Sequence, residues 1–144
     1  MPNFELHPQL AADTFEIIRL PLCRVLLMND ANYPWLILVP QRADVRELFE
    51  LGVDDQMQFM RESSLVAHML HTQFKADKIN IAALGNLVPQ LHIHHVARYQ
   101  SDSAWPAPVW GRLPSTPYNQ AQLDTRIDML RLALSCSTAD ENAP

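Results

Sequence analysis

The 144-residue chain has the size of one compact domain, and a composition of 48% apolar and 19% charged residues is that of a globular protein. Its formal charge of −5 argues against a surface that neutralises nucleic-acid phosphates, because such surfaces need clustered Lys and Arg. No apolar run approaches the ~20 residues that span a bilayer, and the first residues lack a signal-peptide pattern. We therefore expect a cytoplasmic protein with no nucleic-acid or membrane partner.

Five runs of apolar and β-branched residues predict strands, at residues 15–20, 23–28, 35–39, 78–83 and 91–97. A short helix is expected near residues 8–13. Between residues 54 and 74, apolar side chains recur at helical spacing, so we expect a long helix whose Met57 and Met60 help to cover the sheet. Together these elements predict an α+β domain on an about five-stranded antiparallel sheet.

The C-terminal third begins with residues 99–118, where four prolines and two tryptophans exclude a regular element. Trp105 and Trp110 either close the core or contribute to a pocket or subunit interface, and the sequence leaves both open. Asn119 is the predicted N-cap of a final amphipathic helix that ends near Leu134. We therefore expect a single domain over residues 1–134 and a flexible polar tail over residues 135–144.

The last predicted strand carries the chemistry. Side chains alternate between the two faces of a strand, so Gln90, His92 and His94 point to one face while Leu91 and Ile93 point to the other. An isolated histidine is usually a core or surface residue. Two histidines and an amide in strict alternation, with apolar residues opposite, indicate a functional site instead.

Three kinds of chemistry can use this face. A metal site is one, since imidazoles bind zinc and iron, but no acidic third ligand follows before Asp102 and the cationic Arg98 lies nearby. The second is nucleophilic attack on phosphorus by His92, because a neutral imidazole with an ordinary pKa of about 6.5 needs no deprotonating partner. His94 would then donate to a phosphoryl oxygen and Gln90 would order the site. The third is a binding pocket without catalysis, which uses the same donors.

Residues 84–96, Leu-Gly-Asn-Leu-Val-Pro-Gln-Leu-His-Ile-His-His-Val, resemble the signature of the histidine-triad (HIT) family, with Gln90 in place of the first histidine. The resemblance extends to the expected hairpin at residues 28–40 and to the segment Ala104-Trp105-Pro106. It covers roughly residues 15–112. The triad motif is the most specific part of the match.

This resemblance implies a homodimer of α+β subunits that bind a nucleoside monophosphate moiety. On matching positions His92 is the nucleophile that attacks the α-phosphorus, and His94 contacts the phosphate. The substrate-binding residues that it implies are Asn29 near the ribose, Asn80 near the phosphate, Asn86 on the leaving side, and Trp105. The implied reactions are hydrolysis of nucleoside phosphoramidates or dinucleoside polyphosphates, or nucleotidyl transfer, with no catalytic metal and no cofactor.

The chain departs from the family pattern at three positions. Gln90 replaces the first histidine, and Leu87 stands where many members carry a serine that contacts the phosphate. These two changes bear on rate and substrate preference more than on reaction type, and they support a non-catalytic nucleotide-binding module as the alternative hypothesis. His95 replaces an apolar residue on the opposite face, and we expect a local bend of the strand or an exposed edge there.

Overall fold

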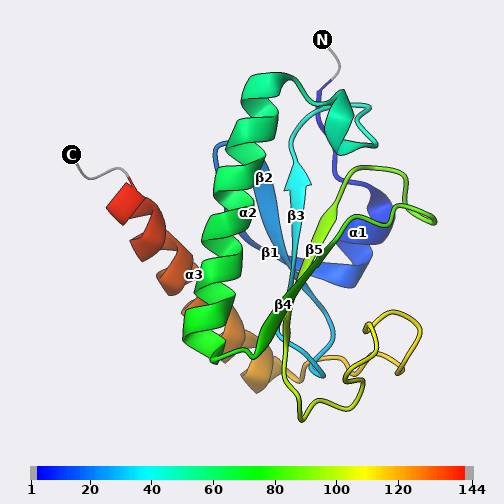
Figure 1. The fold of residues 1–144 in the computed structure, drawn as a ribbon, viewed down its shortest axis with the longest axis vertical. Helices are drawn as coiled ribbons and strands as arrows, with labels where there is room; N and C mark the ends of the chain where they lie inside the picture. The colour runs from blue at the N-terminus through cyan, green and yellow to red at the C-terminus, as the bar shows by residue number, and fades with distance from the viewer. Residues whose placement is uncertain (1–2, 142–144) are drawn as a thin grey trace.

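The computed structural model describes residues 3–141, shown as a ribbon in Figure 1. Its strands are β1 (Thr14–Arg19), β2 (Cys23–Met28), β3 (Trp35–Pro40), β4 (Lys78–Ala82) and β5 (Ile93–Arg98). Its helices are α1 (Pro8–Asp13), α2 (Val53–Phe74) and α3 (Gln120–Glu141), with a short 3-10 turn, η1, at Leu48–Glu50. The five strands form one sheet in the order β1-β2-β3-β5-β4, with every neighbouring pair antiparallel. The predicted α+β class is confirmed.

The position of β5 in the sheet explains its burial. Although β5 follows β4 in the chain, it lies between β3 and β4, and all six of its residues are buried. A strand with a neighbour on each side has its backbone groups paired on both edges, which fixes its register firmly. Side chains on β5 are therefore held in place with little freedom.

Each face of the sheet has its own apolar cluster. Helices α2 and α3 cover one face, where Leu36, Leu38 and Ile93 are buried (Figure 1). Trp35 and Ile37, which alternate with those two leucines along β3, belong to a second cluster on the opposite face. That second cluster also contains residues of α1 and of the proline-rich segment at residues 99–118. The opposite face is therefore closed by α1 and loops, which leave room for a cavity.

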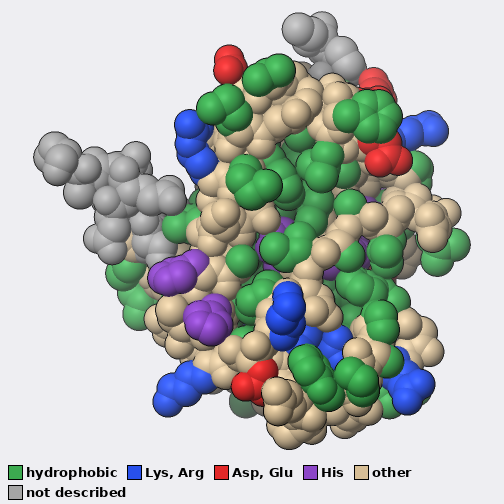
Figure 2. Space-filling view, viewed as in Figure 1, with side chains coloured by type: hydrophobic (Ala, Val, Ile, Leu, Met, Phe, Trp, Pro, Cys, Tyr) green, Lys and Arg blue, Asp and Glu red, His purple; other side chains and the backbone are tan. Residues whose placement is uncertain are grey.

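Helix α2 packs through a face that differs from the predicted one. Phe59, Val66 and Leu70 are buried against the sheet, whereas Met57 and Met60 are more than half exposed. The prediction that these methionines cover the sheet was wrong, because they lie two residues before and one residue after Phe59, off the buried face. Figure 2 shows hydrophobic side chains exposed on the face that α2 and β4 present to the viewer. Among the described residues, no helix is long and apolar enough to cross a membrane.

Helix α3 begins as predicted and ends later than predicted. The Asn119 side chain accepts from the backbone N–H of Gln122 at 2.8 Å, and the Gln122 side chain accepts from the backbone N–H of Asn119. This reciprocal pair satisfies two N–H groups at the helix start. The helix then continues through residues 135–141, predicted as tail, because no Gly or Pro interrupts it there. The rest of the predicted tail, residues 142–144, lies outside the described residues.

Candidate active site

The two site histidines lie where β5 begins. The strand starts at Ile93, not at Leu91 as predicted, so His92 precedes it by one residue. The pairing with β3 stops at Leu38 and Ile93 because the backbone N–H of Leu91 donates to Val45 and Pro40 lacks an N–H. His92 is thus held at the end of the ladder, where a side chain can face an opening.

The predicted alternation of faces is confirmed for His92 and His94. Leu91 and Ile93 are buried on the side of α2 and α3. His92 and His94 are 7% and 5% exposed and line a cavity of about 750 Å³ on the other side. That volume lies in the range of small-molecule sites, ~300–1,000 Å³. The lining includes His7, Asn86 and Trp110 besides the two histidines.

A backbone carbonyl fixes the tautomer of His92. Its Nδ1 lies 2.7 Å from the carbonyl oxygen of Gln90, which can only accept. Nδ1 of the neutral ring therefore carries the proton, and Nε2 keeps its lone pair. The His92 and His94 rings meet edge to face with centroids 5.1 Å apart. An unprotonated nitrogen thus lies beside a second imidazole in the cavity.

An indole fixes His94 in the opposite tautomer. The Nε1–H of Trp35 donates to His94 Nδ1 at 2.9 Å, so the proton of the neutral ring is on Nε2. Burial, with smaller contributions from His92 and His95, lowers the pKa of His94 to about 4. His94 is therefore neutral at pH 7. The pair offers one acceptor and one donor side by side.

The other four predicted polar residues lie in four different places. Asn86 lines the histidine cavity. Asn29 lines an adjoining cavity of about 360 Å³ that shares Trp110 with the first, and its amide oxygen accepts from the backbone N–H of Tyr118. Asn80 faces the same side of the sheet as His94, but its amide oxygen accepts from Arg98. Gln90 turns its amide to the N-terminal segment and does not line the histidine cavity.

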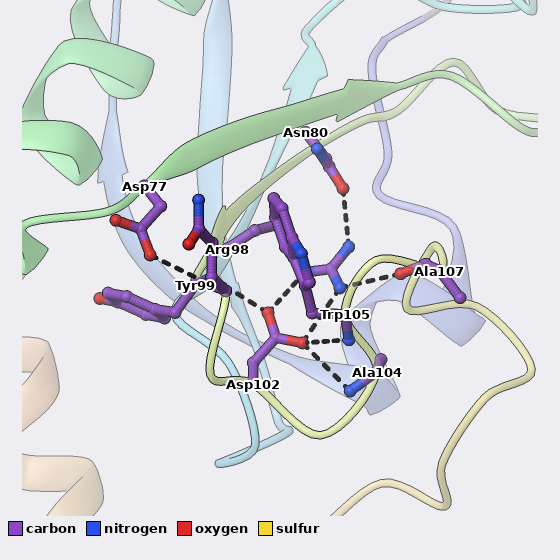
Figure 3. Close-up of polar contacts among 9 residues, drawn as sticks. Asp77, Asn80, Arg98, Tyr99, Asp102, Ala104, Trp105 and Ala107 are labelled. Carbon is purple, nitrogen blue, oxygen red and sulfur yellow. Dashed lines mark hydrogen bonds and ion pairs between the residues drawn. The ribbon is translucent and has the colours of Figure 1, made fainter.

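Trp105 lies over Arg98, outside the histidine cavity (Figure 3). Arg98 is 1% exposed and pairs with Asp102, with Nε and Oδ2 2.9 Å apart. Asp102 also accepts from the backbone N–H groups of Tyr99, Ala104 and Trp105. Hydrogen bonding from Arg98 lowers the pKa of Asp102 to about 2. The tryptophan at the cavity is instead Trp110, whose ring centroid is 5.2 Å from that of His94.

His95 ties the sheet to α2. Its side chain is fully buried, with Nδ1 3.1 Å from the Ile93 carbonyl and Nε2 2.7 Å from the Ser63 hydroxyl. The carbonyl accepts, so Nδ1 carries the proton and Nε2 accepts from Ser63. Burial lowers the pKa of His95 to about 4. The expected exposed edge was wrong, since His95 is a satisfied polar contact between layers.

Sequence reasoning missed Trp35 and His7, and it left open whether Trp110 lines a pocket. Trp35 contacts His94 from the neighbouring strand β3, and His7 reaches the cavity from the N-terminal segment. No local pattern signals such contacts. Leu87, in contrast, lies on the cavity lining as its motif position suggests, with its side chain 97% exposed. Among the side chains that the structure describes, residues 3–136, no group of three His, Cys, Asp or Glu is arranged to hold a metal ion.

Comparison with known proteins identifies the family. Residues 9–101 match the model of the HIT domain, and the chain belongs to that family. A histidine triad protein from Bradyrhizobium japonicum is 47% identical, with a TM-score of 0.90 over 92% of this chain and 99% of the other. One from Marinobacter aquaeolei is also 47% identical, with a TM-score of 0.91 over 94% of this chain and 98% of the other.

A curated relative with a stated activity is more distant. The bis(5'-adenosyl)-triphosphatase of Saccharomyces cerevisiae is 31% identical over 70 residues, which are 45% of this chain. The match spans only about a third of that enzyme, 34% of its length. The similarity therefore concerns a part of the yeast protein.

Proposed function

We propose that the protein is a nucleotide hydrolase in which His92 attacks the α-phosphorus and carries the nucleotidyl group between two displacements. The observation that carries the proposal is the opposite tautomers of His92 and His94 in one cavity. A nucleophile needs the unprotonated Nε2, and a developing phosphoryl charge needs a fixed donor. Family membership and the similarity to a bis(5'-adenosyl)-triphosphatase support the same reaction class.

The reaction consists of two displacements at the α-phosphorus. The Nε2 lone pair of His92 forms a bond to the α-phosphorus, the bond to the leaving oxygen or nitrogen breaks, and the leaving group departs with the bonding electrons and takes up a proton. Water then attacks the phosphorus and releases a proton to the solvent, the P–N bond breaks with its electrons returning to Nε2, and the nucleoside monophosphate leaves. While the ring is phosphorylated it is cationic, and the Nδ1–H bond to the Gln90 carbonyl stabilises that charge.

His94 has the properties of a stabilising donor. Its pKa of about 4 keeps the ring neutral, so its single Nε2–H is already oriented when the phosphoryl oxygens gain charge. Because Trp35 determines which nitrogen carries that proton, its indole is a positioning group for the reaction. Asn86, on the same cavity, is the asparagine best placed to meet a leaving group.

Replacing Trp35 by Phe is expected to lower kcat on the order of tenfold, the value of roughly one hydrogen bond. The variant keeps an aromatic ring in the core but removes the donor to His94 Nδ1, so the ring can adopt the other tautomer. Steady-state kinetics with a nucleotide that the wild type hydrolyses measures the change in kcat. Trp110→Phe is the matched control, because among the described residues Trp110 Nε1 has no hydrogen-bond partner. Equal losses in the two variants would show that ring size, not the hydrogen bond, matters.

The reaction class is tested by incubating the protein with an adenosine phosphoramidate and with diadenosine triphosphate, each with and without a chelator. We expect release of AMP from at least one of them at a rate that the chelator does not change. Loss of turnover on chelation would contradict the metal-independent mechanism. Tight binding of AMP without turnover of either substrate would support the alternative, a non-catalytic nucleotide-binding module.

The homodimer and the cytoplasmic location stay predictions. Exposed apolar side chains on the outer face of α2, namely Val53, Met57 and Met60, offer a surface that a second copy could cover (Figure 2).

A further inference from the structure

Gln90, at the first triad position, holds the N-terminal segment with both atoms of its amide. Its Oε1 accepts from the backbone N–H of His7 at 2.8 Å, and its Nε2 donates to the carbonyl of Glu5 at 2.8 Å. These partners lie 83 and 85 positions away in the sequence. The amide thus makes one accepting and one donating hydrogen bond to the backbone of the segment, as the backbone of a neighbouring strand does. It is occupied by the chain itself, so it is not the group that meets a ligand.

This docking brings a third imidazole to the cavity. His7 lines it together with His92 and His94, and its ring is half-buried. His7 Nδ1 accepts from the backbone N–H of Gln9 at 3.1 Å, at the start of α1. The neutral ring therefore carries its proton on Nε2, an N–H donor with no hydrogen-bond partner in the part of the chain whose side chains the structure describes. A histidine of the N-terminal segment thus joins the two triad histidines at the cavity.

The contacts that hold the three histidines follow the order of residues 90 to 94. The bond to Gln90 places the His7 backbone at the Gln90 end of the row, whereas Trp110 packs on His94 at the other end. Along the chain, His92 lies between Gln90 and His94. Donors on the two sides of a nucleophile contact different parts of a bound substrate. If His94 serves the phosphoryl group under attack, the donor on the other side serves a neighbouring acceptor.

We propose that His7 is a substrate-contacting residue that donates from Nε2 to phosphate oxygens beyond the α-phosphate, and that Gln90 is the residue that positions it. The inference rests on the proposed function and gives its substrate class. A dinucleoside polyphosphate has such oxygens, and a phosphoramidate with an amine leaving group has none. The site therefore favours polyphosphates.

The test compares four variants on diadenosine triphosphate and on an adenosine phosphoramidate. His7→Asn keeps an oxygen that can accept from Gln9 but removes the imidazole, and His7→Ala removes both. We expect each to lower kcat/KM for the polyphosphate on the order of tenfold, as for one hydrogen bond to a charged group, and to leave the phosphoramidate within about twofold. Gln90→Ala should match that loss. Asn3→Ala, an exposed change in the same segment, is the control.

A double variant separates positioning from direct contact. Because Gln90 acts through His7, combining Gln90→Ala with His7→Asn should cost no more than either change alone. Full polyphosphate activity in His7→Asn would reduce the role of His7 to helix capping and overturn the inference. Equal losses of kcat/KM on both substrates would also overturn it. The same holds if the loss in the double variant is the sum of the losses of Gln90→Ala and His7→Asn.

Failure of the proposed function gives a separate result. If the wild type turns over neither substrate, the proposed hydrolase function is contradicted. Calorimetric binding of diadenosine triphosphate then tests whether His7 contacts the ligand. Roughly tenfold weaker binding by His7→Asn than by Asn3→Ala would then support the contact. Equal binding by the two variants, or no binding by the wild type, would overturn it.

Discussion

Replacing His92 by Asn is expected to lower kcat/KM by roughly a thousandfold or more, the usual consequence of removing a covalent nucleophile. Asparagine is polar and smaller than histidine, so the cavity keeps its shape. What it lacks is a nitrogen lone pair that can bond to phosphorus. The fold should not change, because among the described residues the hydrogen bond of the His92 ring is to the carbonyl of Gln90, two residues away. Steady-state hydrolysis of diadenosine triphosphate measures the loss, and a thermal melt checks that the variant is folded.

The control for His92 is an exposed histidine. His71 lies on the solvent side of α2, so His71→Ala tests the loss of an imidazole away from the cavity. We expect wild-type activity from it. More than about a tenth of wild-type activity in His92→Asn would contradict a nucleophilic role, since general electrostatic help alone is worth less than covalent catalysis.

Replacing Asp102 by Ala is expected to reduce the free energy of unfolding by about 3–5 kcal/mol, because it leaves a buried guanidinium without its carboxylate. Arg98 and Asp102 are 1% and 7% exposed, and Figure 3 shows the carboxylate between Arg98 and three backbone N–H groups. The pKa of Asp102 near 2 has the same cause. Since that pKa is below the unfolded value, the carboxylate stabilises the fold above about pH 4 and loses this effect as the pH falls toward 2.

Asp77 offers a control in the same region. It is exposed and accepts one backbone hydrogen bond, from Gln100 at 2.9 Å, so Asp77→Ala should cost about 1 kcal/mol. Urea denaturation of both variants gives the comparison. Equal losses would show that the Arg98–Asp102 pair contributes little beyond a surface contact. If Asp102→Ala has the larger loss, we also expect Trp110 to pack less well on His94. Asp102 and Trp110 lie in the same loop, residues 99–118, so loss of the Asp102 hydrogen bonds loosens the segment that carries Trp110.

The sheet could be predicted from sequence because its signals are local. Apolar runs and turn residues located all five strands to within about two residues, and alternation gave the correct faces for His92 and His94. Polar composition misled at the end of α3, where the absence of Gly and Pro mattered more. On α2, Met57 counted as an apolar residue in the pattern although its side chain points outward. The residue type alone does not show which face of a helix is buried.

The details of the site could not be predicted because they depend on residues far apart in the chain. The tautomer of His94 depends on Trp35, 59 positions earlier, and the orientation of Gln90 depends on the N-terminal segment. The sequence pointed to Trp105 at the substrate, but Trp110 lines the cavity and Trp105 covers Arg98. No periodicity distinguishes two tryptophans in a proline-rich loop. Only the fold shows which of them faces the histidines.

The most direct measurement is to trap the intermediate. The wild type is mixed with diadenosine triphosphate, quenched in alkali within a turnover, and examined by mass spectrometry for a modified peptide. We predict one nucleoside monophosphoryl group bonded to His92, and none on the protein in His92→Asn. Turnover by the wild type with the group never on the protein, or with the group on another residue, would contradict the account.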